Sequence, residues 1–212
     1  MGSVYEQLDG RLQQWVLDQP VFFVATAPLA GDGHVNLSPK GSRGTLVVLD
    51  GRTLAYLDLT GSGVETIAHL RENGRITLMW CAFDGPPKIL RVHGTGDVVR
   101  PGDDRWPAVA APFGAAADDP GVRAVITVHA ERISDSCGYA VPLLDFRAER
   151  DVLARWQANR GPAGLAEYRR TRNATSLDGL PGLPGLPDPP DLPDLPDVPD
   201  VPDVPDLAVE RT

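Results

Sequence analysis

Lys40 and a hydroxyl-rich turn at residues 59–66 are the parts of this sequence best suited to binding an anion. The turn, LTGSGVET, runs directly into residues with helical spacing, and Ser62 lies at its centre. Free N–H groups at a helix N-terminus, together with the positive end of the helix dipole, favour a phosphate. A lysine adds a point charge, so Lys40 at the end of HVNLSPKG would complete such a site if the two segments meet. The candidate ligands from the turn are the amides and hydroxyls of Thr60, Gly61, Ser62 and Thr66.

Simpler interpretations of the same residues stay open. Ser62 and Glu65 have capping-box spacing, so Ser62 could do no more than cap the helix. Lys40 could be a turn lysine that faces solvent. Asp58 ends a strand just before the turn, where it could accept a hydrogen bond from a hydroxyl of a bound ligand or cap the turn.

The other reactive residue types give weaker signals. Cys137 lies in the loop SDSCGYAVP, but no neighbouring residue would clearly activate it, so a packed, inert thiol is the favoured interpretation. Two cysteines provide neither a disulfide scaffold nor a metal cluster. The histidines have no metal-ligand spacing of the kind seen in zinc sites, and they are His34, His69, His93 and His129.

Charge and hydropathy exclude several classes of protein. Of the net charge of −9, residues 176–212 carry −8, which leaves the rest of the chain near neutrality. No basic stripe suited to nucleic acid appears. No apolar run approaches the roughly 20 residues of a membrane span, and the polar N-terminus does not resemble a signal peptide. We therefore expect a cytoplasmic protein that acts on neither nucleic acid nor membranes.

The elements that must position these residues are mostly strands. Apolar and β-branched runs bounded by turn residues predict strands within 21–27, 34–39, 45–59, 75–83, 88–99 and 122–133. Asp50-Gly51 predicts a hairpin inside 45–59, and Gly94 and Gly96 predict a bulge or bend. Helical spacing is seen in 4–18, in 64–73 and from 145 onward, whereas the segment around Trp106 is expected to be a loop. Six or seven strands with few intervening helices favour an antiparallel barrel over a doubly wound sheet.

A triplet repeat rich in proline and aspartate ends the chain. Proline at every third position removes amide donors and fixes φ, so polyproline II or disorder is expected. The predicted organisation is one domain over residues 1–178 and a low-complexity tail over 179–212. We favour an expanded repeat without a specific role over a docking peptide.

The order of VNLSPKG, the long stretch from TLAYLDLTGSGVETIAHL to KILRVHGTG, and DSCGYAVPL resembles the pyridoxamine 5′-phosphate oxidase-related flavoproteins. The resemblance covers about residues 20–145 and is closest to a branch other than the vitamin-converting oxidases. It implies a mainly β, FMN-binding split barrel with flanking helices, and a homodimer with the cofactor at the interface. It also implies that Lys40 matches the lysine of the flavin-binding strand, that the ring lies against Asn36, Ser38 and Pro39, and that Arg91 reaches the flavin. Trp80 and Cys81 would lie at the dimer interface.

Two family features are missing. Val35 stands where the oxidases have an arginine, and the helix start lacks their positive charges, so hydroxyls and amides would have to carry more of the phosphate binding. The C-terminal arginine-and-histidine motif that holds the vitamin substrate is also missing. The resulting hypothesis is an FMN-dependent oxidoreductase that transfers hydride to or from another small substrate. The alternatives are the same fold binding F420 or haem, or a non-catalytic flavin-binding protein.

Overall fold

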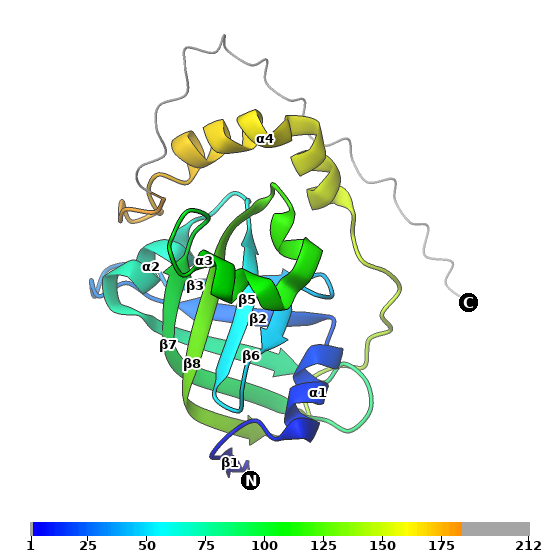
Figure 1. Ribbon diagram of the computed structural model, residues 1–212. Helices are drawn as coiled ribbons and strands as arrows, with labels where there is room; N and C mark the ends of the chain where they lie inside the picture. Colours follow the sequence, from blue (N-terminus) through cyan, green and yellow to red (C-terminus); the bar gives the residue numbers. More distant parts are fainter. Residues whose placement is uncertain (1, 184–212) are drawn as a thin grey trace.

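An antiparallel sheet that curls around one hydrophobic core forms the body of the protein (Figure 1). The computed structural model describes residues 2–183, so the repeat beyond 183 lies outside the described residues. Seven strands follow the order β3-β2-β6-β7-β8-β5-β4, and β1 adds to β8. They are β1 (Val4–Tyr5), β2 (Val21–Thr26), β3 (Asn36–Gly41), β4 (Leu46–Val48), β5 (Thr53–Leu59), β6 (Arg75–Cys81), β7 (Ile89–Val99) and β8 (Val122–Ser136). The predicted mainly β split barrel is confirmed.

Helices cover the ends and one outer face of the curled sheet. They are α1 (Gly10–Asp18), α2 (Glu65–Asn73), α3 (Trp106–Ala110) with the 3-10 helix η1 (Ala111–Asp118), and α4 (Val152–Arg172). Figure 1 shows α4 crossing the molecule on the side of α3, with α1 at the other end near β1. Helices α1 and α2 contribute buried residues to the main core, among them Leu12 and Ile67. Among residues 2–183, no helix is both long and apolar enough to span a membrane.

Strand β5 is buried on both faces, which fixes its position in the fold. Tyr56 faces the main core, whereas Leu57 packs in a second cluster with Phe113 of η1. The predicted hairpin is confirmed, since β4 pairs with β5 from Leu46↔Tyr56 to Val48↔Leu54. The predicted bulge is also confirmed, because the β7–β8 register shifts between His93 and Gly94.

Two of the sequence predictions about secondary structure are wrong. Residues 4–5 form a short strand that pairs with β8, and the helix begins only at Gly10. The cause is Asp9, whose carboxylate accepts hydrogen bonds from the N–H groups of Arg11 (3.0 Å) and Leu12 (2.9 Å) and so sets the helix start. The expected loop around Trp106 is helical, because Pro107 lies in the first turn, where a missing N–H costs nothing.

The chain after β8 folds back over the barrel. Helix α4 begins at Val152, later than the predicted 145, and is kinked where Gly161 has a left-handed φ of 64° before Pro162. Leu165 is fully buried, and the rings of Trp156 and Tyr168 meet edge to face at 5.0 Å, as expected of packing residues. Leu183, within the segment assigned to the tail, is 5% exposed and belongs to the main core.

Candidate functional site

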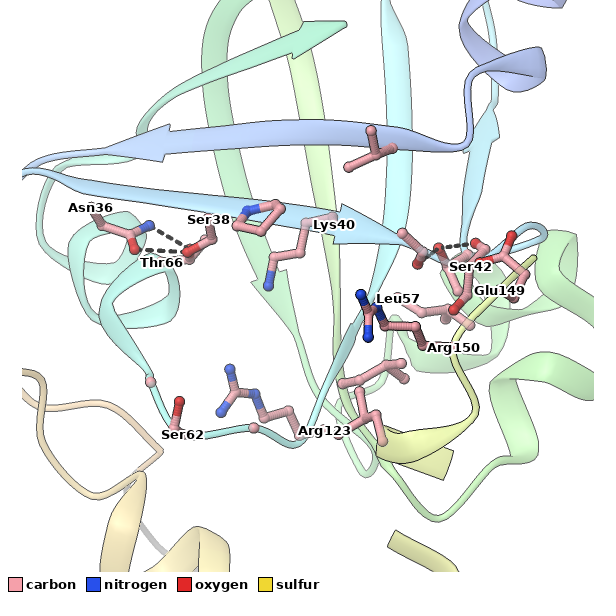
Figure 2. Close-up of a pocket in the computed structure, with 18 of the residues that line it drawn as sticks. Asn36, Ser38, Lys40, Ser42, Leu57, Ser62, Thr66, Arg123, Glu149 and Arg150 are labelled. Atoms are coloured by element: carbon pink, nitrogen blue, oxygen red, sulfur yellow. Dashed lines mark hydrogen bonds between the residues drawn. The ribbon is translucent and has the colours of Figure 1, made fainter. Parts of the chain in front are cut away.

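A cavity of about 620 Å³ lies between the edge strand β3 and the end of β5, where the barrel is split (Figure 2). This volume is within the range of small-molecule and cofactor sites. Seven of the predicted site residues line it, and they are Asn36, Ser38, Pro39, Lys40, Gly61, Ser62 and Thr66. The fold therefore brings the lysine strand and the glycine-rich turn together, which sequence spacing alone could not establish.

Lys40 reaches across the split to β5. Its Nζ lies 2.8 Å from Oδ1 of Asp58, and Nε of Arg123 lies 2.7 Å from Oδ2 of the same carboxylate. Asp58 is fully buried. Burial raises the pKa of Asp58, but the two cations outweigh burial and hold this pKa at about 2, below the ordinary 3.8. Two cations share one carboxylate, so the triad leaves one net positive charge at the cavity.

Arg123 was missed by the sequence analysis, which expected the phosphate site to lack further positive charge. It is 5% exposed and lies in β8. Asp58 pairs with Ala124 but Leu59 pairs with Val122, so Arg123 is the extra residue of a bulge. A bulge re-aims a side chain relative to simple alternation. Arg123 thereby supplies a charge that the sequence appeared to lack.

The residue after α4 fixes both Arg123 and the glycine-rich turn. Asn173 is fully buried; its Oδ1 accepts from Nη1 of Arg123 at 2.8 Å, and its Nδ2 donates to the carbonyl of Gly61 at 3.1 Å. The segment following the barrel is thus part of the site. No motif in the sequence marks Asn173 for this role.

The turn itself presents unused donors. Among residues 2–183, the backbone N–H groups of Gly61, Ser62 and Gly63 donate no hydrogen bond. Thr60 faces away from the cavity, because its hydroxyl donates to the carbonyl of Gly121 (2.9 Å) and accepts from Nε of Arg169 (2.7 Å). Thr60 therefore supports the turn from behind and is not available as a ligand.

The predicted capping box at the start of α2 is wrong. The N-cap residue is Val64, and no side chain caps the helix. The Glu65 carboxylate instead accepts from the N–H of Leu177 at 3.2 Å, and Ser62, which forms no hydrogen bond with another residue of 2–183, lines the cavity. At the other end, Gly74 has a φ of 70° and its N–H donates to the carbonyl of Leu70, as expected of a glycine that ends a helix.

A hydrogen-bond network orders the β3 side of the cavity. Nδ2 of Asn36 donates to the hydroxyls of Thr66 (3.1 Å) and Thr26 (3.2 Å), and its Oδ1 accepts from Ser38 at 2.8 Å (Figure 2). Behind it, Nδ1 of His69 lies 3.0 Å from the Thr26 hydroxyl. His69 is fully buried, and this burial lowers its pKa, so its ring is neutral at pH 7.

Arg91, Trp80 and Cys81 do not line the cavity. Arg91 lies on β7, which β6 and β2 separate from β3, and it donates to the hydroxyl of Ser136 at 3.0 Å. Trp80 is fully buried in the core of its own chain and Cys81 is 8% exposed, so neither forms an interface surface. Cys137 is exposed. No three His, Cys, Asp or Glu side chains within residues 2–183 are grouped to hold a metal ion.

Comparison with known proteins identifies the family. The profile described as pyridoxamine 5′-phosphate oxidase matches residues 8–137. The pyridoxamine 5′-phosphate oxidase family protein ustO of Aspergillus flavus is 42% identical over 195 residues, which cover 84% of this chain and 77% of that protein.

Proteins of known structure that resemble this chain share less sequence identity with it than ustO does. HupZ of Group A Streptococcus is 22% identical, with a TM-score of 0.46 over 59% of this chain and 90% of its own. An FMN-binding protein from Syntrophomonas wolfei is 13% identical, with a TM-score of 0.42 over 65% of this chain and 85% of its own. The family profile and the identity to ustO decide the assignment: the chain belongs to the pyridoxamine 5′-phosphate oxidase family.

Proposed function

We propose that this protein binds FMN in the cavity between β3 and β5 and acts as a flavin-dependent oxidoreductase on a small substrate. The observation that carries the proposal is the net positive charge of the Lys40–Asp58–Arg123 triad beside three unused backbone N–H groups of the 61–63 turn. A phosphate needs this combination of charge and directed donors. The family assignment supports the same ligand class.

The residues present fit a flavin along the rest of the cavity. Apolar side chains that an isoalloxazine ring can pack against are those of Val21, Pro39, Leu57 and Leu59. When bound, flavin supplies reversible hydride transfer, and the protein supplies binding, orientation and exclusion of water. F420 also carries a phosphate and a tricyclic ring, so the same groups could hold it. None of the residues that line this cavity is a histidine, so the cavity itself offers no imidazole ligand to a haem iron.

We also propose that the protein is a homodimer with the cofactor sites at the interface. The support is an exposed apolar surface beside the cavity, where Val35 is 73% and Leu37 is 63% exposed on either side of Asn36. Covering these side chains with a second copy would remove apolar surface from water and close the cavity at β3. Sedimentation of the purified protein with and without FMN tests this proposal.

The first experiment on function is an absorption spectrum of freshly purified protein, with the released ligand identified by mass. We expect flavin bands and FMN at about one copy per chain. A colourless protein that fails to take up added FMN would contradict the proposal, and F420 released in its place would replace the cofactor.

The phosphate site is tested by titration with FMN and with riboflavin, which lacks the phosphate. Lys40→Gln should weaken FMN binding by about 1–3 kcal/mol, the cost of losing a hydrogen bond to a charged group, and should leave riboflavin binding unchanged. Lys88→Gln is the matched control, because Lys88 is the other lysine of the chain and stacks on Trp15, away from the cavity. Equal effects of Lys40→Gln on both ligands would refute a phosphate contact.

A further inference from the structure

A cation that the proposed cofactor site does not use lines the same cavity. Arg150 lies two residues before α4, in the segment that follows the barrel. Figure 2 shows its guanidinium directed into the cavity beside Leu57, on the side of Ser42 and Glu149. The family match ends at residue 137, so Arg150 belongs to the part of the chain beyond it.

The other basic groups of the cavity, Lys40 and Arg123, are already engaged by a carboxylate. Lys40 and Arg123 both bind the carboxylate of Asp58, at 2.8 and 2.7 Å. Arg150 forms no hydrogen bond or ion pair with any residue of 2–183. Its five donors are therefore available to a ligand.

The acidic groups of the cavity do not compete for Arg150. Oε1 of Glu149 accepts from the N–H of Arg43 at 3.3 Å. Glu65 is turned toward the N–H of Leu177. Within residues 2–183 neither carboxylate pairs with Arg150, so an anion that enters on the side of Arg150 meets an unpaired guanidinium.

The surroundings of Arg150 define the rest of the ligand. Leu153 follows on the first turn of α4, is 41% exposed and lines the cavity outside the set of side chains assigned to the flavin ring. A guanidinium binds a carboxylate through two parallel hydrogen bonds. The site therefore suits a molecule with one carboxylate and an apolar body.

The anion at Arg150 is distinct from the cofactor phosphate. In Figure 2, Ser62 and the tip of Arg123 lie at one end of the cavity, and Arg150 lies apart from them on the side of Ser42. A phosphate that uses the N–H groups of the 61–63 turn leaves Arg150 for a second group.

We propose that Arg150 determines substrate specificity by binding the carboxylate of a small substrate with an apolar body. This inference rests on the proposed function, because the substrate would lie in the cavity that holds the flavin. It assigns the substrate class and gives the segment after the barrel a role in recognition.

The test uses the full chain, with and without FMN, and titration calorimetry with three probe anions: benzoate, phenylacetate and 3-phenylpropionate. Benzamide serves as the neutral counterpart of benzoate. Arg150→Gln should raise the Kd of the best-bound anion at least tenfold, and Arg150→Lys should restore part of the affinity. Arg147→Gln is the matched control, because Arg147 is exposed on the same segment and does not line the cavity. It should leave the Kd unchanged.

Separate outcomes distinguish this inference from the proposed function. If the wild-type protein binds none of the three anions, or if Arg150→Gln and Arg147→Gln bind them equally, the inference is overturned. If Arg150→Gln weakens FMN but not riboflavin, Arg150 binds the cofactor phosphate, and the inference is again overturned. If FMN fails to bind but the anions bind in an Arg150-dependent manner, the carboxylate site stands and the flavin assignment fails.

Discussion

Replacing Asp58 by asparagine removes the carboxylate that Lys40 and Arg123 share. Each carboxylate oxygen of Asp58 accepts a hydrogen bond from one of these two cations, and the side chain is fully buried. Removing one partner of a buried ion pair typically costs about 3–5 kcal/mol, because the remaining charge stays unpaired. Here two cations lose their counter-charge, and the amide of asparagine would present N–H donors to a cation. We expect Asp58→Asn to lower the free energy of unfolding at pH 7 by several kcal/mol.

The pKa of Asp58 gives a second, independent magnitude for the contribution of this carboxylate to the free energy of unfolding. A folded-state pKa of about 2 against an ordinary value of 3.8 corresponds to about 2 kcal/mol of stability. Because the folded pKa is the lower one, this stability is present above pH 3.8 and is lost as the pH falls through about 2. The difference in unfolding free energy between wild type and Asp58→Asn should therefore be constant above pH 5 and shrink by about 2 kcal/mol toward pH 2.

Denaturant unfolding at a series of pH values from 7 to 2 measures both quantities. Subtracting the variant curve from the wild-type curve cancels the other carboxylates. Asp97→Asn is the control, because Asp97 pairs with Arg105 at an exposed site and such pairs contribute at most about 1 kcal/mol. A loss below 1 kcal/mol at pH 7, or a difference that stays constant down to pH 2, would refute the electrostatic account of the triad.

Two further predictions concern residues outside the cavity. Nδ1 of His34 lies 2.6 Å from Oδ1 of Asp178, and this contact raises the pKa of His34. The contact should therefore hold below pH 6.5 and weaken as the pH rises through the folded-state pKa of His34. NMR titration of Asp178→Asn should show the His34 pKa returning toward 6.5, and an unchanged pKa would contradict the contact. A Cβ at Gly94 would lie 1.9 Å from the carbonyl of His129, so Gly94→Ala should destabilise the fold by about 1–3 kcal/mol or more in denaturant unfolding. Gly10→Ala, where a Cβ meets nothing within 4 Å, should be near neutral, and equal effects of the two would contradict the close approach.

Local patterns predicted the strands because each is bounded by turn residues and carries its own apolar period. The hairpin at Asp50-Gly51 and the left-handed Gly74 are local in the same sense. The two errors in secondary structure arose where a single polar or cyclic residue outweighed the apolar spacing. Asp9 moved the start of α1, and Pro107 began a helix where a loop was expected.

The sequence predicted only part of the site, because Arg123 and Asn173 join it through contacts between residues that are far apart along the chain. Lys40 and Ser62 belong to motifs with recognisable chemistry, and the fold places both at one cavity. Arg123 is 65 residues from Asp58, and a register shift, which no sequence pattern marks, turns it toward that carboxylate. Asn173, 112 residues after Gly61, joins that residue to Arg123 by means of hydrogen bonds that depend on where α4 ends.

The segment after the barrel is linked to the charges that the helix start lacks. Arg123 supplies positive charge in their place, and Asn173 of that segment holds Arg123 in position. Without Asn173, Arg123 would be a buried cation beneath the turn, and its counter-ion Asp58 would still be shared with Lys40. Asn173 accepts a further hydrogen bond from Arg123 without adding charge, so the triad keeps its net +1 while the guanidinium is held in place. A second carboxylate at residue 173 would satisfy Arg123 equally well but would cancel the charge that faces the cavity. The neutral amide is thus the side chain that both holds the guanidinium and leaves the site positive for an anion.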